Sequence, residues 1–275
     1  MKNKVLTGLL LVLIGGWGNL LAQNAGSNYA RQVNTLIGTK GVGLTSGYLY
    51  PGATYPYGMV QFTPSYFSKR SGFVINQLSG GGCEHMGNFP TFPVKGKLKM
   101  SPDNILNYRI NISEEKGHAG YYEAKVQEDI HAKLTVTERT GMASYEYPAD
   151  QQYGTVIIGG GISATPIDQA AIVITAPNKC EGYAEGGNFC GLRTPYKVYF
   201  VAEFDADALE SGTWKRDELK PNTTFAEGEY SGVYFTFDVN KKKNIQYKIG
   251  VSYVSVENAR ENLKAENTGW DFLQI

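Results

Sequence analysis

The sequence predicts an all-β protein: a large antiparallel β-sandwich followed by one short C-terminal helix. Three observations support this: apolar and polar residues alternate over much of the chain, turn signals recur at short intervals, and helical periodicity occurs only near the C-terminus. Alternation with a period of two is the pattern of a strand with one buried and one solvated face. Many such strands separated by regular turns are typical of a sandwich.

The alternation is clearest in three segments, 122–126, 130–136 and 245–253. Segment 196–204 alternates less cleanly because Tyr199 and Val201 lie on its outer face, so we expect it to be covered on both sides. Turn signals occur at residues 138–141, 148–150 and 227–228.

The C-terminal helix is predicted from residue 256 onward. Ser255 can cap its N-terminus, and Val256, Ala259 and Leu263 form an apolar stripe at helical spacing. Trp270 follows the helix, with Phe272 two residues later, and both rings need a surface to pack against.

The first 22 residues have the pattern of a secretory signal. Lys2 and Lys4 precede an apolar run from 5 to 21, and Ala22 offers a small residue for cleavage. The alternative is a transmembrane anchor, but glycines at 15, 16 and 18 interrupt the run. We therefore expect a signal peptide at 1–22, a sandwich at 23–254 and a bridging helix and linker at 255–275. The mature chain is expected in the periplasm or outside the cell.

The charge balance gives no reason to expect binding to nucleic acid or to a membrane surface after signal cleavage. The chain has 26 Lys plus Arg and 26 Asp plus Glu, so its formal net charge is zero. Its 33 glycines and 19 tyrosines suit strands, turns and surfaces that stack on sugars. The length after cleavage fits one large all-β domain as well as two small ones.

The candidate functional site is the turn at residues 80–85. An apolar segment, predicted as a strand over 73–78, leads into three consecutive glycines and then a thiol, a carboxylate and an imidazole. Glycines permit positive φ and close approach of another group. The candidate residues for the wall of a ligand pocket are Gly81, Gly82, Cys83, Glu84, His85 and, from a tyrosine-rich loop upstream, Tyr50.

Several functions remain open for this turn. Glu84 and His85 are interpreted as ligand-binding groups, an acid/base pair, members of a metal site or a solvated pair. Zinc has little support because Cys83 and His85 lack a second pair of ligands at suitable spacing. The turn is not a phosphate-binding loop, since no Lys-Ser/Thr follows it. Neither a Ser-His-Asp triad nor a pair of glycosidase carboxylates stands out from spacing.

The loop that contains Tyr50 holds four tyrosines within ten residues, at positions 48, 50, 55 and 57. These rings fit either core packing or a carbohydrate platform. The three cysteines cannot all pair. Cys180 and Cys190 are close in sequence and flank two glycines, so they are the candidate pair for a disulfide that leaves Cys83 free. The alternative, which the sequence leaves open, is that all three are reduced.

Several segments resemble the N-terminal domain of glycoside hydrolase family 92. The most similar are 33–39 (VNTLIGT), 50–61 (YPGATYPYGMVQ) and 78–83 (LSGGGC). Others are 120–122, 134–141, 197–204 and 251–263, so the match runs in order from residue 33 to the end. The resemblance implies an exported, calcium-dependent, inverting exo-α-mannosidase, often acting on N-glycans, in which a β-sandwich precedes a larger (α/α)₆ barrel.

The chain departs from the family pattern at two positions. Two histidines usually precede the Leu-Ser-Gly turn, whereas Ile75 and Gln77 stand there in this chain, so linkage preference is not carried over. The resemblance also implies that the catalytic acid, the base and the calcium ligands lie in the C-terminal module, outside these 275 residues. We therefore assign no catalytic residue and no metal ligand in this chain.

The resulting expectation is an N-terminal sandwich that contributes a pocket wall and a domain interface without catalysing turnover alone. Its expected partners are mannosides or N-glycans and an (α/α)₆ module, covalently attached or encoded downstream. Two alternatives are a free-standing carbohydrate-binding or scaffold protein and a truncated gene product without an independent role.

Overall fold

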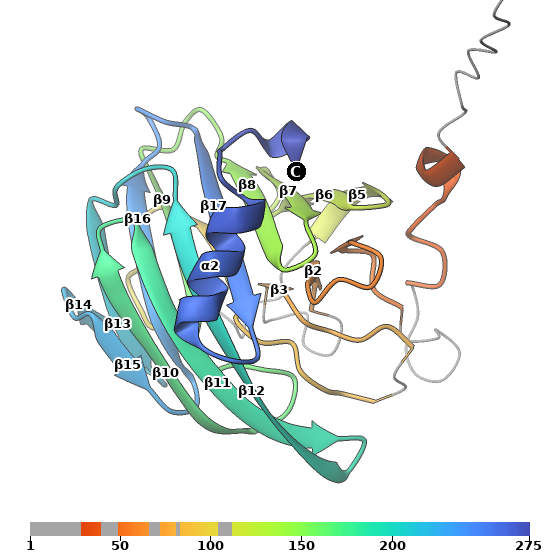
Figure 1. The fold of residues 1–275 in the computed structure, drawn as a ribbon. Helices are drawn as coiled ribbons and strands as arrows, with labels where there is room; N and C mark the ends of the chain where they lie inside the picture. The colour runs from red at the N-terminus through yellow and green to blue at the C-terminus, as the bar shows by residue number, and fades with distance from the viewer. Residues whose placement is uncertain (1–28, 40–48, 66–71, 81–82, 104–111) are drawn as a thin grey trace, which may run out of the picture.

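The computed structural model describes residues 29–39, 49–65, 72–80, 83–103 and 112–275 (Figure 1). The expected signal segment, 1–22, lies outside the described residues. Among the helices that are described, none is long and apolar enough to cross a membrane.

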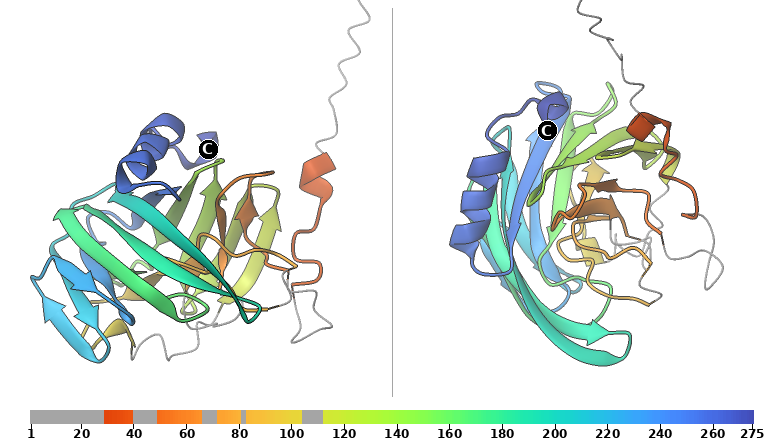
Figure 2. Two further views of the ribbon diagram at one scale, coloured as in Figure 1. Left: turned by 60° about the horizontal axis from the view of Figure 1, so that its bottom comes forward. Right: turned by 45° about the vertical axis from the view of Figure 1, so that its right-hand side comes forward.

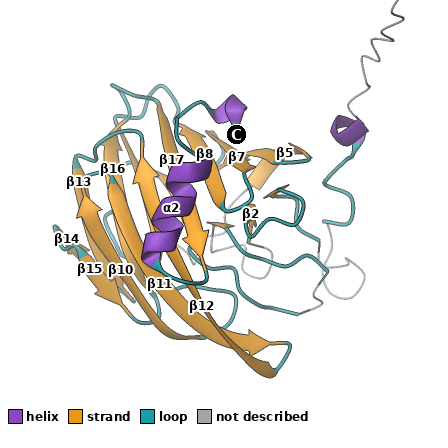
Figure 3. Ribbon diagram, in the orientation of Figure 1, coloured by secondary structure: helices purple, strands orange, loops and turns teal. Residues whose placement is uncertain are grey.

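The described strands form two antiparallel sheets (Figure 3). The eight-stranded sheet has the order β1 (Ala53–Thr54), β2 (Gln61–Pro64), β3 (Phe73–Val74), β4 (Thr91–Lys95), β9 (Tyr153–Gly159), β16 (Ser231–Asp238), β13 (Glu210–Lys215), β14 (Glu218–Pro221). The nine-stranded sheet has the order β15 (Phe225–Glu227), β10 (Ile167–Ala176), β11 (Lys179–Phe189), β12 (Leu192–Phe204), β17 (Asn244–Ser252), β8 (Thr140–Glu146), β7 (Ile130–Val136), β6 (Tyr121–Val126), β5 (Ile112–His118). The remaining described elements are α2 (Val256–Glu266) and two 3₁₀ turns, η1 (Tyr29–Gln32) and η3 (Phe272–Gln274). The predicted all-β sandwich with a C-terminal helix is confirmed.

The core lies between the two sheets and is rich in aromatic rings. Phe204 of β12 contacts Phe235 and Phe237 of the facing sheet, with ring centroids 4.9 and 5.1 Å apart. On its own sheet it meets Tyr247 at 5.3 Å. These rings are all at most 1% exposed. Tilted aromatic pairs of this kind add to the stabilisation from burial.

The period-two segments form strands where the sequence places them. Residues 122–126, 130–136 and 245–252 lie in β6, β7 and β17. The strand predicted over 73–78 is shorter, because β3 ends at Val74. Past that point Ile75 bonds to Gln61 and Asn88 through its backbone, and only a single parallel bridge at Asn76 remains. The chain therefore leaves the sheet earlier than its apolar character suggested.

Helix α2 packs on the outer face of the nine-stranded sheet, over β12 and β17 (Figures 1 and 2). Its Ala259 and Leu263 bury Val201 of β12, so this strand is covered on both sides as expected. The side chain of Ser255 accepts a hydrogen bond from the Asn258 amide, which confirms the predicted cap. Gly250 of β17 lies beneath the helix, and a Cβ there would meet the Ala259 carbonyl oxygen at 2.5 Å.

Polar contacts fix the chain where α2 ends. Glu266 accepts hydrogen bonds from the Thr137 hydroxyl (2.6 Å) and the Arg139 amide (2.8 Å), and its carboxylate also pairs with the Arg139 side chain. The Lys248 ammonium donates a hydrogen bond to the Asn267 carbonyl oxygen at 3.0 Å. Burial lowers the pKa of this ammonium.

The two aromatic residues after the helix pack on the same sheet. The Lys248 ammonium lies 4.4 Å from the centre of the Trp270 ring. Phe272 meets Tyr121 of β6 edge-on, with ring centroids 6.2 Å apart. The expectation that both rings find a packing surface is confirmed.

Candidate functional site

The candidate turn belongs to a longer loop, residues 76–88, whose two ends are joined by a buried pair of asparagines. The Asn76 side-chain amide donates to Asn88 Oδ1 at 2.9 Å, and the Asn88 backbone amide donates to Asn76 Oδ1 at 2.7 Å. Tyr196 of β12 donates its hydroxyl to the same Asn88 oxygen at 2.9 Å. Burial raises the pKa of Tyr196 to about 12, so the phenol stays a donor at physiological pH. The neck of the loop is therefore tied to the nine-stranded sheet.

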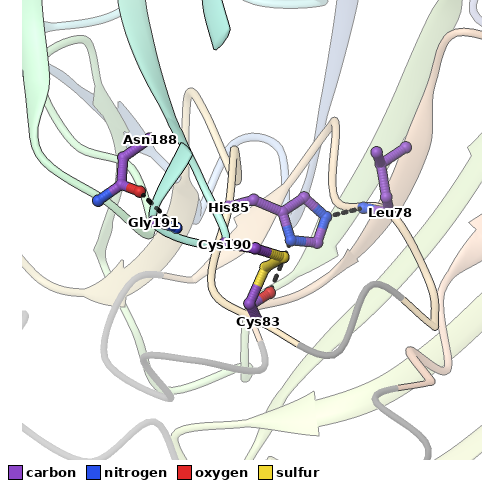
Figure 4. The surroundings of a disulfide bond; sticks show 6 residues. All are labelled: Leu78, Cys83, His85, Asn188, Cys190 and Gly191. Atoms are coloured by element: carbon purple, nitrogen blue, oxygen red, sulfur yellow. Dashed lines mark hydrogen bonds between the residues drawn. A yellow bond between two sulfur atoms is a disulfide. The ribbon is translucent and has the colours of Figure 1, made fainter. Parts of the chain in front are cut away.

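His85 pins the interior of the loop and is fully buried. Its Nε2 accepts a hydrogen bond from the Leu78 amide at 2.9 Å, and its Nδ1 lies 2.7 Å from the Cys83 carbonyl oxygen (Figure 4). Because an amide only donates and a carbonyl only accepts, these contacts assign the hydrogen to Nδ1 of a neutral ring. The ring also packs against Phe189 of β11, with centroids 4.8 Å apart. His85 is thus a structural group and not a solvated or acid/base residue.

A disulfide between Cys83 and Cys190 joins the loop to the tip of the β11–β12 hairpin (Figure 4). The predicted Cys180–Cys190 disulfide is therefore wrong, and Cys83 is not free. The segment between Cys180 and Cys190 is the extended strand β11, which separates their positions by about 30 Å at ~3.3 Å per residue. Cys180 is the free cysteine and is fully buried in the core, where burial raises the pKa of its thiol.

The first glycine of the turn, Gly80, is needed for backbone conformation. Gly80 has φ of 76°, a region that side-chain-bearing residues avoid, whereas a Cβ there would have open space around it. Glycine is therefore required at position 80 by its positive φ, and not by the close approach of another group. Gly81 and Gly82 lie outside the described residues.

The outer surface of the loop is formed by a few exposed side chains. Glu84 is exposed and makes no hydrogen bond or ion pair with another residue of the described ranges. Leu78 is 49% exposed. The neighbouring Ser79 hydroxyl accepts a hydrogen bond from the Gln61 side chain at 2.9 Å. This surface combines one charged acceptor with neutral polar and apolar groups.

The tyrosine-rich loop divides into buried and exposed rings. Tyr50 is only 6% exposed and belongs to the core, so its ring is not a surface platform. Tyr55 and Tyr57 are exposed. Tyr48 lies outside the described residues.

Metal ligands do not gather in the part of the chain that the structure describes. No three His, Cys, Asp or Glu side chains there are placed to hold an ion. His118 stacks on Tyr121, with ring centroids 4.8 Å apart, and His131 lies 3.6 Å from the Glu123 carboxylate. The described residues therefore offer no cluster of three such side chains to an ion.

Sequence reasoning missed the residues that support the loop. These residues are Asn76, Asn88, Phe189 and Tyr196. Asn88 and Tyr196 are 108 residues apart in the chain, and no local spacing signals their contact. The neighbouring asparagines carry a weak signal only, since polar residues within an apolar segment often mark a turn.

Fold and loop together define a β-sandwich domain in which one surface loop is held covalently and by buried hydrogen bonds while its outer side chains remain available. Residues 32–252 match the model of the glycosyl hydrolase family 92 N-terminal domain. The chain belongs to this family.

Solved structures share this fold, and a curated relative is similar in sequence. A GH92 family glycosyl hydrolase, ccman5, superimposes with a TM-score of 0.76 at 22% identity, over 90% of this chain and 35% of that one. A family GH92 α-mannosidase from Bacteroides thetaiotaomicron gives 0.75 at 24% identity, over 88% and 35%. An uncharacterized secreted glycosidase of Arthroderma benhamiae is 26% identical over 89% of this chain and 36% of its own length. The chain thus spans about a third of these relatives.

Proposed function

We propose that this chain is the N-terminal β-sandwich of a secreted exo-α-mannosidase acting on mannose-containing glycans. The observation that carries the proposal is the family match over residues 32–252, together with relatives about three times as long. Its relatives include an α-mannosidase and a glycosidase, which supports a glycan substrate. The sandwich supplies a wall of the sugar pocket and a docking surface, while an (α/α)₆ module supplies catalysis and binds calcium.

The proposed domain organisation has three segments. A signal peptide ends near Ala22, the sandwich spans 23–254, and 255–275 bridges to the next module. The contacts of Glu266 and Lys248 hold that bridge against the nine-stranded sheet, which suits a segment that sets the direction of the next module. The secreted relative and the Cys83–Cys190 disulfide support export to the periplasm or the exterior, because disulfides persist in oxidising compartments.

Within the proposed pocket wall the candidate residues have different roles. Glu84 exposes its side chain, whereas Cys83 and His85 shape the loop through the disulfide and the buried ring. Tyr50 supports the wall from the core. Gly81 and Gly82 remain candidate residues of the wall. Loops that converge at a domain interface are a common way to build such a pocket.

The test is an activity assay on purified residues 23–275 with an aryl α-mannoside and with N-glycans, in the presence of calcium. We expect no release of mannose. Measurable release would refute the division of labour between the two modules. Sequencing the DNA beyond codon 275 provides an independent check, since a reading frame that encodes a helical barrel is expected there.

A free-standing carbohydrate-binding protein is the second candidate. The exposed rings of Tyr55 and Tyr57 favour it, because exposed tyrosines on a loop suit stacking against sugars. Calorimetry of the purified chain against mannosides separates the two functions. Tight binding without any second module would favour the lectin-like function.

A further inference from the structure

Glu84 stands between two residues that are each fixed by a separate interaction. Cys83 on one side is bonded to Cys190, and His85 on the other is buried in the loop. We propose that Glu84 is the group through which this domain accepts hydrogen bonds from a pair of glycan hydroxyls, and that Cys83, Cys190 and His85 are its positioning residues. This inference rests on the proposed function and assigns a specificity-determining contact to it.

The two anchors fix the backbone of Glu84 from both directions. The disulfide ties Cys83 to a hairpin 107 residues away in sequence. One residue after Glu84, the His85 ring is bonded to the Leu78 amide and the Cys83 carbonyl. A binding group held in this way loses less conformational freedom when a ligand arrives, so more of the hydrogen-bond energy contributes to affinity.

The carboxylate of Glu84 is available to a ligand. It is exposed and has no partner among the residues that the structure describes. The sequence from 71 to 94 contains neither Lys nor Arg, so this segment offers no cation to neutralise it. An ionised carboxylate only accepts hydrogen bonds and has room for several, whereas sugar hydroxyls donate. Two adjacent hydroxyls of one sugar ring can therefore share a single carboxylate.

The neighbouring surface suits a sugar better than a cation or an acidic group. Leu78 is half exposed and offers an apolar contact for ring C–H groups. The Ser79 hydroxyl, one residue further along the loop, accepts a hydrogen bond from the side-chain amide of Gln61 in β2, so this pair is polar and neutral. Among the described residues, no three His, Cys, Asp or Glu side chains are placed together to hold a metal ion.

The experiment is a titration of the isotope-labelled chain with methyl α-D-mannoside and with an α-linked mannobiose, followed by NMR. We expect the Glu84 amide and side-chain carboxyl signals to move. Glu84→Gln, which keeps the shape and removes the charge, should weaken binding roughly ten-fold or more, as charge-assisted hydrogen bonds predict. The matched control is Glu261→Gln on the exposed face of α2, which should leave binding unchanged.

A second pair of variants tests positioning. Replacing both Cys83 and Cys190 by Ala keeps Glu84, yet the affinity should fall and the Glu84 carboxyl signal should no longer respond to the sugar. Cys180→Ala, which removes a thiol from the core without touching the disulfide, should retain the response. The positioning role would be contradicted if Cys180→Ala lost the response to the sugar while the double cysteine variant kept it.

Three outcomes would overturn the inference. Unchanged affinity in Glu84→Gln would exclude the contact, and so would the absence of any shift in the loop up to the solubility limit of the sugar. A fall in melting temperature for Glu84→Gln as large as that of the double cysteine variant would assign Glu84 a structural role. These outcomes concern sugar binding at Glu84 only. The proposed function is tested by the mannose-release assay, so the two can fail independently.

Discussion

Two segments attach to the sandwich in contrasting ways: the loop 76–88 and the C-terminal segment from 255 onward. The loop is held by a disulfide, a buried imidazole and an asparagine pair. The C-terminal segment is held first by the apolar stripe of α2 on Val201 and then by charged contacts at its end. The tip of the β11–β12 hairpin, to which the loop is bonded, lies far from the C-terminal end in every view (Figures 1 and 2).

The contrast follows from what each segment can bury. An amphipathic helix buries one face and so offsets the entropy of ordering its backbone. A loop with three consecutive glycines has few side chains to bury and high backbone entropy to lose. Covalent and polar anchors stabilise it instead, and they leave its outer side chains free. A loop held from within therefore keeps its outer side chains exposed, whereas the helix uses one face for attachment.

The largest expected effect comes from removing the covalent anchor. Replacing Cys83 and Cys190 together by Ala should lower the free energy of unfolding by about 4 kcal/mol, since the disulfide closes a loop of 107 residues. Denaturant unfolding of the oxidised chain and the variant measures the difference. A loss below about 1 kcal/mol would show that the polar anchors suffice and would break the comparison.

Truncation of the helix stripe should come next. Leu263 is 2% exposed, so Leu263→Ala should cost about 3 kcal/mol through lost burial and a cavity against the sheet. Thermal unfolding monitors the change, and Lys264→Ala on the exposed side of the same turn is the control. Equal effects of the two substitutions would mean that packing does not attach the helix.

The imidazole within the loop should contribute somewhat less. His85→Ala leaves the Leu78 amide and the Cys83 carbonyl without their partner, at a cost of about 2 kcal/mol. Hydrogen exchange should show the Leu78 amide losing its protection while the amides of β17 keep theirs. If the Leu78 amide stays protected in His85→Ala, another group holds the loop and the role assigned to the ring is wrong.

The smallest effect is expected at the end of the helix. Burial raises the pKa of Glu266, but hydrogen bonds from the Thr137 hydroxyl and from Arg139 outweigh it, so the net pKa is lowered. A carboxyl with a lowered folded-state pKa stabilises the fold above its unfolded pKa of about 4.3 and loses this contribution as the pH falls through the folded value.

Glu266→Gln should therefore cost about 1–2 kcal/mol at pH 7 and progressively less at acid pH. Chemical denaturation at pH 7 and at pH 3 measures this difference. An equal cost at both values would show that the charge of Glu266 is not what attaches the segment.

Local sequence determined much of the fold. Period-two alternation placed β6, β7 and β17, because the side chains of a strand point to opposite faces whatever lies around it. The helix over 256–266 and its Ser255 cap were equally local, since capping and the apolar stripe depend on residues within four positions. The glycine turn was found in the same way, from consecutive residues.

Only the tertiary structure decided what holds that turn. Cys190 cannot pair with Cys180, because the 11-residue strand β11 keeps these two cysteines apart. It pairs instead with Cys83, which is 107 residues away in sequence but lies against the tip of the β11–β12 hairpin in the fold. The burial of His85 and the bond from Tyr196 to Asn88 likewise join segments that are separate in sequence. Such contacts arise from packing of the two sheets and the hairpin, so the spacing of residues along the chain does not predict them. The sequence therefore identified the loop, and the fold showed that Glu84 is exposed while its neighbour His85 is buried.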